Sequence, residues 1–444
     1  MPPVVTEDVE YGGAPRRTQG SKRSPVSVHS GRVAQIRVLD RGHVRRHHPA
    51  DVAGRNVVQP FHELFPGAVA PQVQLGACQE IGLPGRGGVR GEILETEAVD
   101  EARQDEEVEL PCPQLFDLLG DVARHPAYAK SEVALARSNF ASEIEEERST
   151  PDFVAEEQLD KAIFGRHPYA FVVPEPTEIE KVTPEQLKAF AGARYVPNNA
   201  HLIIVGDFDP AAVYDQAQKA FGSWERRPLA AEATSLPTRR DKRQIYFVDR
   251  PSSVQSTIAI GALAMPRQSP DYMSLRTAHM IYGGAFYSRL TLNIREAKGY
   301  TYSPYSQVNL RRRSGSFSAN AAVRNEVTGP TILEMLYELD RMRVAPVTKE
   351  ELDAAKTYSI GGLSLELESQ AGMASRINSI YTYDLARDFL QMFQTRLDAL
   401  TPDDIQKAAA KYFDTYRGAI VVVGDYGQVK DQIAPFGDVV VVKH

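Results

Sequence analysis

The chain has 444 residues, 42% of them hydrophobic and 25% charged, a composition typical of globular proteins of two or three domains. A net charge of −7 gives no electrostatic basis for nucleic-acid binding, and no apolar run is long enough for a transmembrane helix. The first thirty residues lack the apolar stretch of a signal peptide. The sequence does not decide between the periplasm and the cytoplasm.

Residues 1–112 differ from the rest of the chain. They contain three aromatic residues against 34 in the remaining 332, and no sustained period of 3.6 or 2 before Ile93. A segment of this kind buries too little apolar surface to build a core. Two interpretations compete: a disordered or weakly folded extension, or a stretch translated out of frame. The second is favoured, because the internal repeat described below predicts domain elements here that the sequence does not contain.

Helical periodicity begins at Leu115. The patterns that follow predict helices over 115–125, Lys130–Arg148, Phe153–Phe164 and Ala211–Phe221, the third ended by Gly165. Leu229–Lys242, with one proline and several basic residues, is the best candidate for a linker.

The second half of the chain alternates strand and helix patterns. Strands are predicted over Gln244–Arg250, Ser256–Ala264, 314–323 and Val439–Val442, and helices from Tyr272 to Gly284, over Gly329–Val344 and from Glu351 onward. Between them, the stretch 286–307 reads as a helix that turns at Gly299 into an aromatic-rich strand. These patterns predict an α+β fold.

One stretch occurs twice. Thr183–Asp207 and Thr401–Asp425 align without a gap, since 401 − 183 = 218 and 423 − 205 = 218. Each copy opens with a capping Thr and a Pro, continues as an amphipathic helix, and ends in a short apolar strand. The repeat predicts two homologous domains, each a mostly antiparallel sheet packed with helices, with the first one incomplete. The predicted division is 1–112 unassigned, 113–235 as the rest of the first domain, and 236–444 as the second.

Several phrases together resemble the insulinase/pitrilysin/mitochondrial-processing-peptidase family of zinc peptidases. They are "SEIEEERSTPD", "RYVPNNAHLIIVGDFDP", "GGAFYSRLTLNIREAKGYTYSPYS" and the closing "VVVGD", and the resemblance runs from about Leu115 to the end. It implies two homologous α+β domains, a peptide substrate and zinc. It also implies assembly as a homodimer, or as a heterodimer in which a related chain carries the zinc.

The resemblance implies a zinc site made by a His-x-x-Glu-His helix and a Glu farther along the chain. Glu143 matches that third ligand, although it also reads as one more acid on a solvated helix face. The His-x-x-Glu-His motif is absent from these 444 residues. At its expected place stands His62-Glu63 without a partner histidine, and His43–His47 has ligand spacing but Arg46 at the position of the base.

A second family feature is intact. The resemblance implies that Arg295 and Tyr302, seven residues apart, reach the active site, hold a substrate carbonyl and help stabilise the oxyanion. The alternative is an Arg and a Tyr that pack at a domain edge, and Tyr300 is the rival tyrosine. Three functions therefore compete: a peptidase-family protein, a non-catalytic partner subunit that contributes the Arg/Tyr pair, and an inactive remnant.

Overall fold

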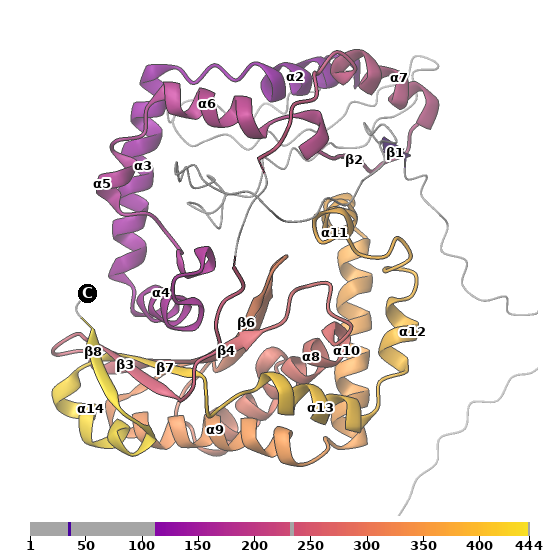
Figure 1. Ribbon diagram of the computed structural model, residues 1–444. Helices are drawn as coiled ribbons and strands as arrows, with labels where there is room; N and C mark the ends of the chain where they lie inside the picture. The colour runs from indigo at the N-terminus through magenta and orange to yellow at the C-terminus, as the bar shows by residue number, and fades with distance from the viewer. Residues whose placement is uncertain (1–33, 37–111, 231–234, 443–444) are drawn as a thin grey trace, which may run out of the picture. The chain divides into compact units, whose positions relative to one another are not determined.

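The computed structural model describes residues 34–36, 112–230 and 235–442 (Figure 1). The predictions for most of residues 1–112, including the out-of-frame stretch, His43–His47 and His62, lie outside these residues. Within the described part, no helix is both long and apolar enough to cross a bilayer.

The helices of the first half begin and end where local chemistry requires. α2 (Cys112–Arg124) ends before Pro126, and α3 (Lys130–Ser149) is followed directly by α4 (Pro151–Phe164). The Thr150 side chain accepts a hydrogen bond from the Phe153 N–H and so caps α4. α4 ends at Gly165, whose φ of 60° favours glycine. The predicted Phe153–Phe164 helix is therefore confirmed and starts two residues earlier.

The remainder of the first half is short helices and one strand. Its elements are α5 (Pro176–Ile179), α6 (Pro184–Arg194), β2 (Leu202–Ile204) and α7 (Pro210–Phe221). β2 pairs antiparallel with β1 (Ala34–Ile36). α6 opens with a capping box in which Thr183 and Gln186 each satisfy the other's backbone N–H.

The second half is built on a six-stranded sheet. Its order is β5 (Tyr305–Leu310), β6 (Gly315–Arg324), β4 (Gln255–Ala264), β7 (Ala419–Gly424), β3 (Gln244–Asp249) and β8 (Val439–Val442). The pairs from β5 to β7 are antiparallel, whereas β3 is parallel to both of its neighbours. The sheet is mixed, and the predicted α+β fold is confirmed.

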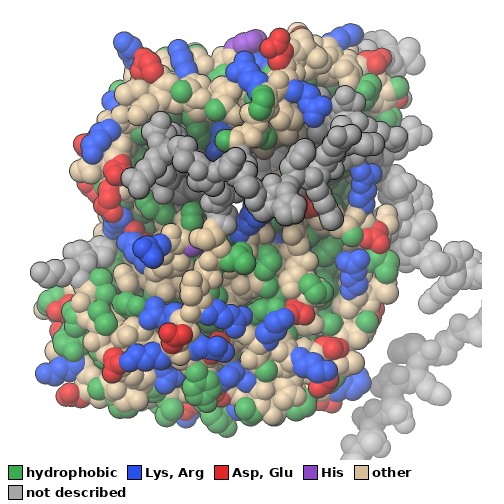
Figure 2. Space-filling model, viewed as in Figure 1, with side chains coloured by type: hydrophobic (Ala, Val, Ile, Leu, Met, Phe, Trp, Pro, Cys, Tyr) green, Lys and Arg blue, Asp and Glu red, His purple; other side chains and the backbone are tan. Residues whose placement is uncertain are grey.

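One face of this sheet is covered by helices of the second half (Figure 1). They are α8 (Tyr272–His279), α9 (Thr328–Val344), α13 (Pro402–Tyr412) and α14 (Tyr426–Ile433). Two π-helical segments, Met280–Gly284 and Thr291–Ala297, follow α8. α10 (Lys349–Leu367), α11 (Gln370–Thr382) and α12 (Phe393–Asp398) complete the second half. On the face shown in Figure 2, Lys and Arg side chains are interspersed with Asp and Glu.

The other face of the sheet is covered by α4, which comes from the first half. Buried α4 side chains form one apolar cluster with residues of β4 and β7. Gly261 on β4 permits this contact, because a Cβ there would lie 2.9 Å from Ile163 Cδ1 and 3.0 Å from Leu159 Cδ2. The sheet of the second half is therefore buried on both faces only with help from the first half.

Candidate functional site

The predicted Arg/Tyr pair lies just before β5. Arg295 is on the second π-helical segment, Thr291–Ala297, and Tyr302 is in the loop that follows. Gly299 stands between them with φ of 63°, the left-handed conformation that lets the chain reverse after the helix. π-Helical turns place side chains at positions that an α-helix would not, and they occur frequently at functional sites.

The structure brings these two side chains together. The Arg295 Cζ lies 4.4 Å from the centroid of the Tyr302 ring and 4.9 Å from that of Phe286. Both rings are open to solvent, with Tyr302 77% and Phe286 69% exposed. Tyr300, the rival tyrosine, instead packs against the core. The pairing of Arg295 with Tyr302 is thus seen directly, whereas the carbonyl-binding role of the pair stays a prediction.

The π-helical segment that carries Arg295 is anchored by polar side chains. Asn293 Nδ2 donates to Glu334 and to Glu338 on α9, at 2.9 Å each. Arg289, one turn earlier, forms a bidentate pair with Glu351 at 2.7 and 2.9 Å. These bonds fix the segment against α9 and α10, so that Arg295 is held in place although its neighbours Phe286 and Tyr302 are exposed.

β5 begins three residues after Tyr302 and is an edge strand, paired only with β6 in the described sheet. Every second residue of such a strand directs its backbone N–H and C=O away from its partner. An extended peptide can add to these groups as a further strand. Since β5 begins three residues after Tyr302, the exposed Arg295–Tyr302 stack and the edge strand are adjacent in the chain.

A row of carboxylates on α4 lies against the sheet near β5, with Asp152 accepting a bond from Thr257 on β4, and the sequence analysis did not single it out. Asp152, Glu156 and Asp160 are spaced by one helical turn, and Glu156 accepts a bond of 3.4 Å from the Tyr305 hydroxyl. Burial, followed by the charge of Glu156, raises the pKa of Tyr305 to about 12. Burial also raises the pKa of Asp160 to about 6, although Arg311 opposes this shift. The spacing i, i+4, i+8 was the available signal, but it does not reveal which strand the row faces.

Glu143 lies on α3 with its side chain exposed. Across residues 112–230 and 235–442, no three His, Cys, Asp or Glu side chains are grouped so as to hold a metal ion. The described residues therefore do not form a zinc site around Glu143, and its ligand role stays a prediction.

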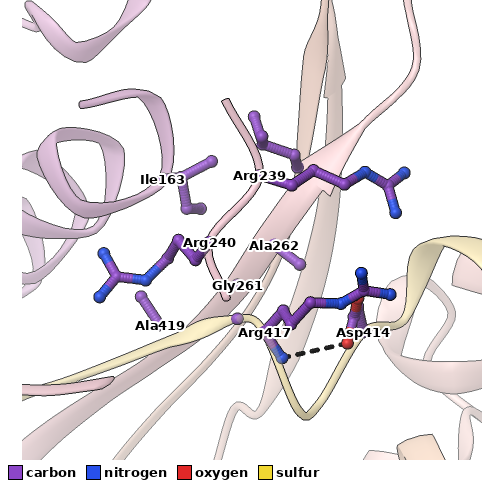
Figure 3. A pocket seen from close by; sticks show the side chains of 10 residues that line it. Ile163, Arg239, Arg240, Gly261, Ala262, Asp414, Arg417 and Ala419 are labelled. Atoms are coloured by element: carbon purple, nitrogen blue, oxygen red, sulfur yellow. Dashed lines mark hydrogen bonds and ion pairs between the residues drawn. The ribbon is translucent and has the colours of Figure 1, made fainter. Parts of the chain in front are cut away.

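A shallow pocket lies where the linker meets α4 and the sheet, and three of its lining residues are arginines (Figure 3). Arg240 points toward α4 and donates to the Ala162 carbonyl at 3.1 Å and to the Tyr246 hydroxyl at 2.9 Å. Arg417 Nε donates to Asp414 Oδ2 at 2.8 Å. These arginines bond to groups of the chain itself, so we interpret the pocket as a packing contact between segments and not as a ligand site.

Comparisons with known proteins show what the chain is similar to. Residues 181–358 match the family described as "Peptidase M16 inactive domain". An uncharacterized zinc protease of Mycobacterium bovis is 26% identical over 320 residues, which are 71% of this chain and 72% of the relative. An uncharacterized zinc protease of Mycobacterium tuberculosis matches equally well.

Solved structures give the same result. A peptidase M16 inactive domain from Pseudomonas fluorescens superposes with a TM-score of 0.64 at 25% identity, over 70% of this chain and 74% of that one. A protease from Helicobacter pylori has a TM-score of 0.65 at 18% identity, over 70% and 76%, and so shares the fold. Together with the phrases quoted from the sequence, these matches support the similarity of the chain to the insulinase, or M16, family of peptidases.

Proposed function

We propose that this chain binds peptides in extended conformation through Arg295, Tyr302 and the open edge of β5, and that a zinc-bearing chain of the same family supplies the hydrolysis. The observation that carries the proposal is the exposed Arg295–Tyr302 stack beside a strand edge that no other described strand pairs with. Edge pairing gives affinity for any peptide backbone, and the two side chains add donors at one defined position.

The chemistry available to the pair is hydrogen bonding to carbonyl oxygens. The Arg295 guanidinium is always charged, and its Nε lies 3.2 Å from Glu296 Oε1, which leaves the terminal N–H groups for a ligand. The Tyr302 hydroxyl is a second donor on the same exposed surface. Donors of this kind hold a peptide carbonyl and stabilise the negative charge that grows on its oxygen when a nucleophile attacks the carbon. Neither group supplies that nucleophile.

The need for a second chain rests on sequence and structure together. The two histidines of the zinc motif are missing from all 444 residues, and the described residues around Glu143 offer no other donor set. A homodimer of this chain would lack the same histidines. A heterodimer with a zinc-bearing relative would combine that chain's metal with the Arg295–Tyr302 pair.

We further propose that residues 113–235 and 236–444 descend from one duplicated unit. Supporting the proposal, α6 and α13 begin at prolines separated by 402 − 184 = 218 residues, and each has a Thr capping box. The apolar strands β2 and β7 follow these helices in both halves. On this interpretation 236–444 is the complete copy and carries the peptide-binding surface.

Peptide binding tests the first part of the proposal. A fluorescent decapeptide should bind the purified chain, and Arg295→Ala should weaken binding about 10- to 100-fold, as expected for charge-assisted bonds. Tyr302→Phe removes one neutral donor and should weaken it about 3- to 10-fold. Arg324→Ala, at the exposed end of β6, is the matched control and should bind as the unmodified chain does. Equal affinity for all four proteins would refute the assignment of the pair.

Hydrolysis tests the second part. The chain alone, with added zinc, should not cleave the peptide, whereas a mixture with a His-x-x-Glu-His relative from the same organism should. In that mixture, Arg295→Ala should lower the rate. Zinc-dependent cleavage by the chain alone would contradict the partner role and favour a self-sufficient peptidase.

A further inference from the structure

Arg267 is a buried arginine outside the Arg295–Tyr302 surface. It lies in the loop between β4 and α8 and is only 8% exposed. Its guanidinium carbon is 3.5 Å from the centroid of the Tyr272 ring, 4.9 Å from that of Phe389 and 6.0 Å from that of Tyr383. The rings come from α8, from the segment before α12 and from the end of α11, so three separate segments enclose one cation.

No carboxylate among the described residues neutralises this cation. The Arg267 backbone N–H donates to the Arg311 carbonyl at 3.0 Å, but its side-chain nitrogens bond to no acceptor in 112–230 or 235–442. A guanidinium keeps its charge and carries five N–H donors. Contact with aromatic faces offsets only part of the cost of removing it from water, and it leaves the donors at the edge of the group unused.

The surroundings of Arg267 add positive charge. Burial and the nearby charges of Arg376 and Arg276 lower the pKa of Arg267, although Tyr272 and Tyr383 oppose the shift. Arg376 is paired with Glu366, and its Nε is buried without a partner.

Arg396 also stacks on Phe389, at 5.7 Å, and its Nη2 lies 3.6 Å from Asp388. Arg276 lies over the Phe393 ring at 5.6 Å. Glu366 and Asp388 thus have arginine partners, and Asp271, next to Tyr272, is bonded to Lys411 and Tyr412. Positive charge remains in excess around Arg267.

We propose that Arg267 and its three aromatic neighbours, the Arg267 site, bind the carboxylate of an acidic side chain of the peptide. A carboxylate matches the edge of a guanidinium with two parallel hydrogen bonds. The aromatic rings exclude water from one side and so strengthen the ion pair. This inference rests on the proposed peptide-binding function. It adds that the surface selects peptides with an acidic side chain at one position.

The position of the site relative to β5 sets the spacing on the peptide. Tyr302 lies before the first residue of β5, whereas the loop of Arg267 is bonded to Arg311, directly after the last. The six residues of β5 span roughly 20 Å at about 3.4 Å per residue. A peptide paired with β5 therefore runs between the two sites, and its acidic group should stand about six to eight residues from the carbonyl held by Arg295.

A purely structural role for Arg267 makes a different prediction. If the cation served only to pack three aromatic rings, its replacement would lower stability without changing the choice between peptides. Selection between an acidic and a neutral peptide separates the two roles.

The test uses two labelled decapeptides, amidated at the C-terminus, that differ only in having Glu or Gln at the two residues nearest one end. With the full chain, fluorescence anisotropy should show the Glu peptide binding about 10- to 100-fold more tightly. Arg267→Gln should abolish the preference, Arg267→Lys should retain part of it, and the control Arg324→Gln should leave it intact. Equal binding of both peptides to the unmodified chain, or an undiminished preference in Arg267→Gln, would overturn the proposal.

Two further measurements keep the result decisive. If neither peptide binds, the proposed function itself fails, whereas binding of both without preference refutes the Arg267 site alone. Binding of inorganic phosphate is measured as well. If phosphate binds the unmodified chain but not Arg267→Gln, and the Glu peptide is not preferred, the ligand of the site is a phosphate group and the carboxylate assignment is overturned. If Arg267→Gln does not fold, phenylglyoxal modification of the unmodified chain decides. The Glu peptide should slow the modification of Arg267 at least about tenfold, and an unchanged rate would refute the site.

Discussion

His279 should make the second half sensitive to acid. It is the last residue of α8, and its Nδ1 lies 2.8 Å from Ser306 Oγ on β5. The ring is closely surrounded, since a Cβ at Gly284 would fall 2.5 Å from its Cε1 and 2.7 Å from its Nε2. Burial, and then the charge of Arg276, lowers the pKa of His279 from 6.5 to about 4.

The sign and size of the effect follow from linkage. A histidine whose pKa is lower in the folded state contributes stability above pH 6.5, which is lost as the pH falls toward 4, because only the unfolded state takes up the proton. At about 1.36 kcal/mol per pH unit, the loss between pH 7.5 and 5.0 is about 2 kcal/mol. His279→Gln removes the titrating group, so its stability should fall about 2 kcal/mol less than that of the unmodified chain over the same interval.

Urea unfolding followed by circular dichroism at pH 7.5 and 5.0 measures this difference. Asp160, whose pKa shifts in the opposite direction, contributes equally to both proteins and cancels in the comparison. His125→Gln, which alters an exposed histidine directly after α2, is the control and should behave as the unmodified chain does. If His279→Gln loses as much stability at pH 5.0 as the unmodified chain, the argument for a buried neutral histidine is wrong.

Three other predictions concern stability. Burial raises the pKa of Asp160 from 3.8 to about 6, so the charged carboxylate destabilises the folded state above pH 6, and this cost shrinks as the pH falls toward 3.8. In urea unfolding, Asp160→Asn should therefore stabilise the protein by up to about 3 kcal/mol at pH 7.5 and by little at pH 4.0. Gly284→Ala forces a Cβ against the His279 ring and should lower the free energy of unfolding by about 1–3 kcal/mol. Gly361→Ala, in open space on α10, should raise it by about 0.5–1 kcal/mol. Thermal unfolding measures both changes, and equal shifts in melting temperature would contradict this reasoning. Proteolytic cleavage within Leu229–Lys242 should leave the two pieces associated in size-exclusion chromatography, because α4 is buried on β4 and β7, and their separation under native conditions would refute that packing.

Much of the secondary structure could be predicted because its signals are local. A capping box needs only a Thr and an acceptor three residues later, and the boxes at Thr183 and Thr401 both formed. Arg295 and Tyr302 were instead singled out by the resemblance to the peptidase family, and the local signal, Gly299, predicts only a turn between them.

Long-range partners could not be predicted in the same way. The apolar face of α4 fits any flat apolar surface, and nothing in its spacing indicates β4 and β7, more than ninety residues away in the chain. The aromatic enclosure of Arg267 likewise depends on segments that only the folded chain brings together. The π-helical geometry around Arg295 was also missed, because one extra residue in a helical turn leaves the hydrophobic pattern almost unchanged.

The place of β7 in the sheet has a consequence for synthesis on the ribosome. β7 lies between β4 and β3 but is made about 155 residues after β4. Until residues 419–424 emerge, β3 and β4 have no strand between them, and each presents an unpaired apolar edge. A nascent chain of this protein must therefore be extended by about 155 residues beyond β4 before its central sheet closes, and during that interval a chaperone can bind its exposed strands.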